Sequence, residues 1–119
     1  MTLGEIQQIL EAEVIVGGNM KREIKMACGS DLMSDVLAFT KSGSLLLTGL
    51  TNLQVVRTAE MAEIEAILFV RGKRPQQETV DLADEKGLPL LTTDLPMYES
   101  CGRLYGNGLP GCSEYRDED

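Results

Sequence analysis

The sequence contains no histidine and no tryptophan, and its aromatic side chains are limited to two phenylalanines and three tyrosines. Without histidine, the commonest general base and a common metal ligand are missing. Ser-His-Asp and Cys-His nucleophile systems are therefore excluded. No GxxxxGK[ST] phosphate-binding loop occurs either. We expect no catalytic residues, and we predict that the protein is not an enzyme.

Basic residues are also few, with 11 Lys and Arg against 19 Asp and Glu and a formal net charge of -8. The longest basic stretch, Arg71-Gly72-Lys73-Arg74, is too short to contact a nucleic-acid backbone. The same acidity disfavours anionic membrane surfaces, and no apolar run approaches the ~20 residues of a membrane-spanning helix. The N-terminus lacks the features of a signal peptide. We therefore predict a cytoplasmic protein that binds neither nucleic acid nor membranes.

Cysteine is scarce, and the three thiols at Cys28, Cys101 and Cys112 include no CxxC pair. An odd number of cysteines fits a reducing compartment better than a disulfide scaffold. Their spacings match no zinc or iron–sulfur signature. We expect two partly buried thiols and one free cysteine near the C-terminus, with no metal and no cofactor.

Hydrophobic residues make up 43% of the chain, which is enough for one domain with its own core. Short apolar runs at residues 14–16, 24–27, 44–48, 66–70 and 88–92 predict strands. Helical periodicity follows the last four of them, and a capping box formed by Thr2 and Glu5 opens a first helix. Successive strand–helix units predict a mostly parallel sheet with helices outside, to which the N-terminal part can add an antiparallel strand.

The predicted helices have recognisable ends. Asp31, Thr51 (with Gln54) and Asp94 stand where N-caps are expected, and Gly87 stands where a helix should stop. Residues 106–111 match GxGxxG, but this stretch follows a helix and precedes acidic residues, so we interpret it as a helix terminator rather than a dinucleotide site. We predict one domain over residues 1–105 and a flexible acidic tail over 106–119, because the tail has no periodic apolar residues to bury.

Polar residues gather where the predicted parallel strands end, which is where ligands bind in open α/β sheets. Hydroxyls, glycines and helix N-termini at this edge can hold an anion or a polar ligand. The candidate ligand-binding residues are Ser30, Asp31, Ser34, Thr48, Gly49, Thr93 and Asp94. The alternative is that the polar residues at this edge only cap helices and bind no ligand. We favour this alternative for the neighbouring Thr92. Among the other polar and aromatic residues, we expect Arg57 and Arg103 to be solvated or ion-paired, and Tyr98 and Tyr105 to pack.

Several segments, taken in order, resemble the DRTGG domain family over about residues 2–109, although the string DRTGG itself is absent. They are Leu3-Gly4-Glu5-Ile6, the strand and turn at 14–18, Gly29-Ser30-Asp31-Leu32-Met33-Ser34-Asp35-Val36, Thr48-Gly49, residues 83–91, and Tyr98 to Tyr105. The resemblance implies a three-layer α/β/α fold with a mostly parallel sheet, similar to the N-terminal domain of HPr kinase. It also implies a dimerising, regulatory role, since such domains occur beside CBS domains and in regulated pyrophosphatases.

Two hypotheses follow. The first is a homodimeric regulatory module that senses a small anionic or nucleotide ligand, with adenine nucleotides as the candidate class, at the edge formed by Asp31, Thr48 and Asp94. The second is an assembly protein for a larger metabolic complex. The resemblance suggests that this complex is related to an iron-only hydrogenase, because stand-alone members of the family occur near iron-only hydrogenase genes.

Overall fold

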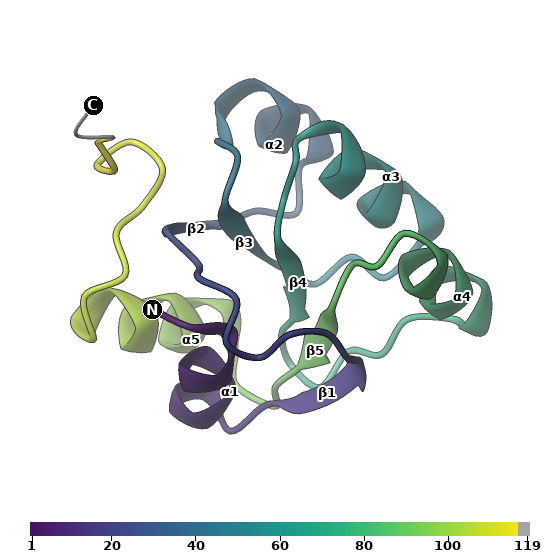
Figure 1. The fold of residues 1–119 in the computed structure, drawn as a ribbon, viewed down its shortest axis with the longest axis horizontal. Coiled ribbons are helices and arrows are strands. Elements are labelled where there is room, and N and C mark those ends of the chain that lie inside the picture. Colours follow the sequence, from purple (N-terminus) through teal and green to yellow (C-terminus); the bar gives the residue numbers. More distant parts are fainter. Residues whose placement is uncertain (117–119) are drawn as a thin grey trace.

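The computed structural model describes residues 1–116 as a five-stranded sheet covered by helices (Figure 1). In chain order, the elements are α1 (Leu3–Leu10), β1 (Glu13–Val16), β2 (Met26–Gly29), α2 (Met33–Phe39), β3 (Ser44–Thr48), α3 (Leu53–Met61), β4 (Ala66–Phe69), α4 (Gln77–Glu85), β5 (Leu90–Thr92) and α5 (Met97–Gly106). All the predicted elements are present, with boundaries shifted by a few residues.

The sheet has the strand order β1-β5-β4-β3-β2. Strands β2 to β5 are parallel, whereas β1 pairs with β5 in the antiparallel direction. The predicted mostly parallel sheet with an antiparallel N-terminal member is thus confirmed. Because four strands run the same way, the loops that follow β2, β3, β4 and β5 all emerge at one edge of the sheet.

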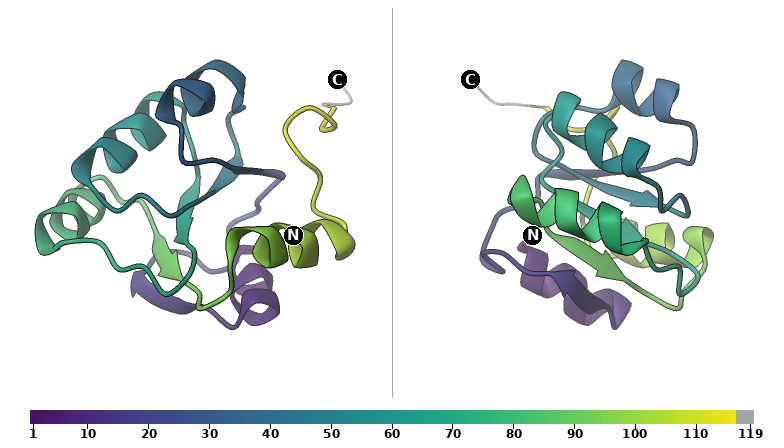
Figure 2. Two further views of the ribbon diagram at one scale, coloured as in Figure 1. Left: turned by 180° about the vertical axis from the view of Figure 1, so that it is seen from behind. Right: turned by 90° about the vertical axis from the view of Figure 1, so that its right-hand side faces the viewer.

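The helices form a layer on each face of the sheet, as the two views in Figure 2 show. Helices α1 and α5 cover one face and enclose a core that includes Leu45, Leu47 and Leu68. Helices α2, α3 and α4 cover the other face, where Leu46, Ile67 and Phe69 are buried. Alternate residues of β3 and β4 therefore pack in two different cores, one on each face of the sheet. This explains why residues 45–47 and 66–69 are all apolar. This three-layer α/β/α arrangement is the predicted fold class.

Helix ends agree with the predictions at some positions only. Thr2 and Glu5 form the expected capping box, and Gly87 follows α4 with a φ of +67°. The predicted caps at Asp31, Thr51 and Asp94 are wrong. The N-cap positions are Leu32, Asn52 and Pro96, none with a side-chain cap bond. Asp31 does not cap α2 because its carboxylate instead accepts hydrogen bonds from the Thr48 hydroxyl and the Gly49 N–H, at the end of β3.

The stretch that follows α5 packs against the domain in its described part. Leu109 is only 3% exposed and belongs to the α1–α5 core, so the expectation that this stretch has nothing to bury is wrong for Leu109. The Ala27 N–H donates to the Pro110 carbonyl at 3.0 Å, which places residues 110–111 along the outer edge of β2. Tyr105 donates a 2.8 Å hydrogen bond to Glu114. The flexibility of the tail stays a prediction, and residues 117–119 lie outside the described residues.

Candidate functional site

Asp31 links the ends of β2 and β3 at the carboxyl edge of the sheet. Its Oδ1 accepts hydrogen bonds from the Thr48 hydroxyl at 2.9 Å and from the Gly49 N–H at 2.7 Å. Thr48 is buried, whereas Asp31 is exposed. Within residues 1–116 the second carboxylate oxygen of Asp31 has no hydrogen-bond partner, so it faces solvent as an acceptor. Three of the seven predicted ligand-binding residues therefore form one cluster.

Asp94 lies at the same edge but next to a different strand. Its Oδ1 is 3.0 Å from the position that a Cβ on Gly72 would occupy, and Gly72 has a φ of +67°. The Gly72 N–H donates to the Thr93 carbonyl at 2.7 Å, which holds the loop after β4 against the end of β5. Because β4 separates β5 from β3, Asp94 lies roughly two strand spacings (about 10 Å) from the Asp31 cluster.

The remaining predicted residues do not join the Asp31 cluster. Thr93 is 2% exposed and donates to the Leu10 carbonyl at 2.6 Å, so it ties the end of β5 to α1. The Ser30 hydroxyl accepts from the Leu32 N–H at 3.0 Å and shapes the turn before α2. Ser34 is exposed on the first turn of α2. Thr92 donates to the Lys73 carbonyl at 2.8 Å, in keeping with a structural role.

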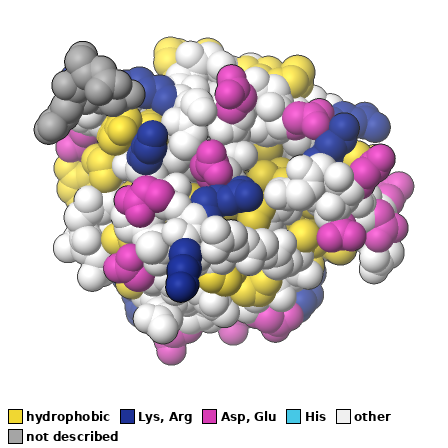
Figure 3. Space-filling view, in the orientation of Figure 1, with side chains coloured by type: hydrophobic (Ala, Val, Ile, Leu, Met, Phe, Trp, Pro, Cys, Tyr) yellow, Lys and Arg dark blue, Asp and Glu magenta, His cyan; other side chains and the backbone are white. Residues whose placement is uncertain are grey.

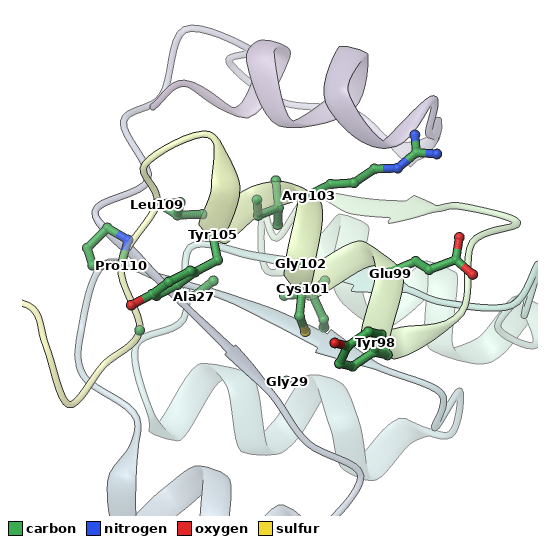
Figure 4. Close-up of a pocket in the computed structure, with 13 residues that line it drawn as sticks. Ala27, Gly29, Tyr98, Glu99, Cys101, Gly102, Arg103, Tyr105, Leu109 and Pro110 are labelled. Atoms are coloured by element: carbon green, nitrogen blue, oxygen red, sulfur yellow. The ribbon is translucent and has the colours of Figure 1, made fainter.

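A pocket lies elsewhere, between the outer strand β2, helix α5 and residues 109–111. It has a volume of about 650 Å³. Its floor comprises Ala27, Gly29 and Leu47, and α5 forms one wall (Figure 4). Gly29 and Leu47 directly precede Ser30 and Thr48, so the pocket adjoins the end of the sheet that carries the Asp31 cluster. Sequence reasoning missed this pocket, because its walls come from segments far apart in the chain.

Two tyrosines flank the pocket. Tyr98 is 89% exposed and Tyr105 is 60% exposed, so the prediction that they pack against the rest of the protein is wrong. Both project from α5, with Cys101 between them, as Figure 4 shows. The hydrogen bond to Glu114 raises the pKa of the Tyr105 phenol above its ordinary value. The sequence signal for this feature was the helical spacing of Tyr98, Cys101 and Tyr105, which places them on one face of α5.

The charged residues of α5, Glu99 and Arg103, line the pocket, and in Figure 4 their charged ends point away from β2. Arg103 lies 3.6 Å from the Glu11 carboxylate and donates to the Ile9 carbonyl at 3.4 Å, so the expectation that it is ion-paired is confirmed. The face shown in Figure 3 carries Lys and Arg side chains singly or in small groups among Asp and Glu.

All three cysteines are half-buried and free. Burial raises the pKa of the Cys28 and Cys101 thiols, so their thiolate forms are scarce at neutral pH. Cys112, expected to be a free tail cysteine, lies 3.3 Å from the Ser44 hydroxyl. Over residues 1–116, no group of three or more Cys, Asp or Glu side chains is arranged to hold a metal ion. No helix in the same range is long and apolar enough to span a membrane.

Comparison with known proteins gives a family and a structural relative. A family profile described as the DRTGG domain matches residues 5–105. The chain is also similar in fold to the crystal structure of the CBS and DRTGG domains of the regulatory region of Clostridium perfringens pyrophosphatase, complexed with its activator diadenosine tetraphosphate. The TM-score is 0.73 at 17% identity; the match covers 99% of this chain and 51% of that one, so this chain spans about half its length. No curated protein sequence matches the chain.

Proposed function

This chain belongs to the DRTGG domain family, and we propose that it is a regulatory, non-catalytic module that senses a small ligand. The observation that carries the proposal is the open carboxylate of Asp31, held at the carboxyl edge of the sheet by Thr48 and Gly49. Ligands of open α/β folds bind at this edge. The fold relative is a regulatory region complexed with diadenosine tetraphosphate, so adenine nucleotides are the ligand class that we propose.

The geometry suggests how such a ligand would be held. The free oxygen of Asp31 can accept hydrogen bonds from hydroxyl groups, such as those of a ribose. Helix α3 begins close to Gly49 without a side-chain cap, so its first N–H groups can donate to an anionic group. The Asp94 carboxylate, beside Gly72, lies about 10 Å from the Asp31 cluster. An extended ligand bound at Asp31 could therefore also contact Asp94. These contacts support binding and positioning of the ligand.

Changing Asp31 to alanine is the first test. In the unmodified protein, an adenine nucleotide at a hundred times its Kd should stabilise the fold by about 2.7 kcal/mol. For a domain of this size, that corresponds to a rise in Tm of roughly ten degrees. Asp31→Ala removes the acceptor and should abolish the rise. The substitution itself should lower the free energy of unfolding by about 1–3 kcal/mol, because the buried Thr48 hydroxyl and the Gly49 N–H lose their acceptor. A thermal-shift titration with ATP, AMP and diadenosine tetraphosphate measures both effects.

The matched control is Asp84→Ala. Asp84 is an exposed acid on α4, and its removal changes the net charge by the same amount. The ligand-dependent rise should be retained in this variant. A flat response of the unmodified protein to every nucleotide would contradict the sensing function, as would an equal loss in both variants. Either result would favour the alternative, an assembly protein that binds another protein.

We further propose that the module is a cytoplasmic homodimer. Four of its large exposed hydrophobic side chains lie on or beside α2 and α3, which are neighbours in Figure 1: Leu32, Leu37, Phe39 and Met61. Exposed apolar side chains gathered on adjacent elements are typical of an interaction surface. Light scattering should give twice the 13.0 kDa chain mass, and Phe39→Glu should reduce it to that of one chain. A mass of one chain at high concentration in the unmodified protein would contradict the dimer.

A further inference from the structure

We propose that the pocket between β2 and α5 binds the uncharged planar ring of a purine base, whose hydrogen-bonding edge is recognised by the free backbone of Gly29. This inference rests on the proposed function, because it names the part of the ligand that the sensor recognises and where that part binds. It does not depend on Asp31, which lies at the neighbouring edge of the sheet.

The size and lining of the pocket suit a small ring system. Its volume of about 650 Å³ lies within the ~300–1,000 Å³ range of small-molecule sites. Leu47, Leu104 and Leu109 contribute apolar surface, and Gly29 and Gly102 leave the floor and one wall without side chains. At Gly29 this space is tight, because an added Cβ would lie 2.8 Å from the Cys101 Sγ. The Cys101 and Met97 side chains therefore fill the space above the Gly29 Cα, and a ligand can reach Gly29 only along the outer edge of β2.

The backbone of Gly29 is free to bond to such a group. The Ser30 N–H donates to the Leu47 carbonyl, so within β2 the residues that bond to β3 alternate with residues that point outward. Ala27 is one of the outward residues, and residues 110–111 already cover its N–H. By this alternation Gly29 is the next outward residue, and among residues 1–116 its N–H and C=O form no backbone hydrogen bond outside the sheet. The pocket floor thus presents one donor and one acceptor side by side.

The tyrosines supply surfaces for stacking. Tyr98 and Tyr105 stand at the two ends of the pocket in Figure 4, and the Tyr105 ring is held by the 2.8 Å bond to Glu114. Aromatic side chains stack on bases through their faces, irrespective of the base sequence. Both rings are largely exposed to water, so a ligand would cover apolar surface that the fold leaves open.

The charged residues that line the pocket are one acid and one base, Glu99 and Arg103, so the lining does not favour a charged group of either sign. Arg103 is already engaged with Glu11 and with the Ile9 carbonyl. A purine edge offers an acceptor beside a donor and carries no charge, so it matches the free donor and acceptor of Gly29. The phosphates of a nucleotide would have to lie outside this pocket.

Adenosine is the probe for this inference because it has the ring without the phosphates. In a titration of the ¹⁵N-labelled protein followed by NMR, adenosine should shift the amide resonances of Gly29 and of the residues around Cys101. The shifts should saturate with a single Kd. Absence of shifts at Gly29 at millimolar adenosine would overturn the proposal.

The test variant is Gly102→Leu, which fills the pocket. No atom lies within 4 Å of a Cβ built at Gly102, and leucine favours a helix more than glycine does, so the variant should fold. It should weaken adenosine binding at least tenfold. Gly106→Leu is the matched control, because Gly106 is an exposed residue of the same helix with equal space but does not line the pocket. This control should bind as the unmodified protein does, and equal binding by both variants would overturn the proposal.

The outcomes separate this inference from the proposed function. If nucleotides stabilise the protein but shift only resonances near Asp31, the sensor stands and the base pocket is wrong. If adenosine binds at Gly29 but no nucleotide response depends on Asp31, the pocket stands and the proposed edge site fails. If the Gly29 resonances move with protein concentration alone, a second copy of the chain occupies the pocket and the proposal is overturned.

Discussion

Replacing Phe69 with alanine should destabilise the domain by about 3–5 kcal/mol, the cost typical of removing a buried aromatic side chain. Phe69 is fully buried at the end of β4, between β3 and β5, and packs in the core beneath α2, α3 and α4. Total stability for a domain of ordinary size is about 5–15 kcal/mol. This one change should therefore remove much of it, and urea denaturation followed by circular dichroism measures the loss.

Phe39→Ala is the matched control for this prediction. The same substitution is made on α2, where the ring is 71% exposed in a single chain, and unfolding is measured at a protein concentration at which light scattering gives the mass of one chain. It should change the free energy of unfolding by no more than about 0.5 kcal/mol, as surface changes usually do. Similar losses in the two variants would mean that the burial of Phe69 does not dominate its contribution to stability.

Replacing Leu109 with alanine should cost about 2–5 kcal/mol, although the residue follows the last helix. Leu109 is 3% exposed and packs in the core beneath α1 and α5. The Leu109 N–H also donates to the Leu104 carbonyl at 3.1 Å, which anchors the turn at the end of α5. The same denaturation experiment measures the cost. Leu37→Ala, at a position 46% exposed on α2, is the control and should cost far less.

Truncation separates the packed part of this stretch from the predicted flexible tail. A chain shortened after Gly111 keeps Leu109 and should lose little stability. A chain shortened after Asn107 lacks that side chain and should be at least as unstable as Leu109→Ala. If both shortened chains retained full stability, the predicted tail would begin at residue 106 as the sequence indicated. The packing of Leu109 would then contribute nothing measurable.

The order and type of the elements could be predicted from the sequence because local patterns determine them. The runs at 45–47 and 66–70 are apolar at every position, and such runs are typical of strands covered on both faces. The Thr2 and Glu5 capping box depends on residues three apart, so it needs no tertiary contact. The family resemblance also depended on ordered local segments, and the profile match confirms it.

Side-chain partners could not be predicted in this way. Asp31 and Asp94 occupy sequence positions typical of N-caps, yet sheet pairing brings Asp31 to Thr48 and Gly49, and loop packing brings Asp94 to Gly72. An aspartate can satisfy one set of donors or another, and the choice depends on which donors the fold places beside it.

The pocket is the clearest case. Gly29, Tyr98 and Leu109 lie up to 80 positions apart in the chain, and only the packing of α5 and of residues 109–111 against β2 places them around one space. By itself, the sequence determined the class of fold, the absence of histidine chemistry and the family, since these follow from composition and local periodicity. Tertiary structure alone decided which polar groups meet, which remain free and where a cavity opens, because those depend on contacts between distant segments.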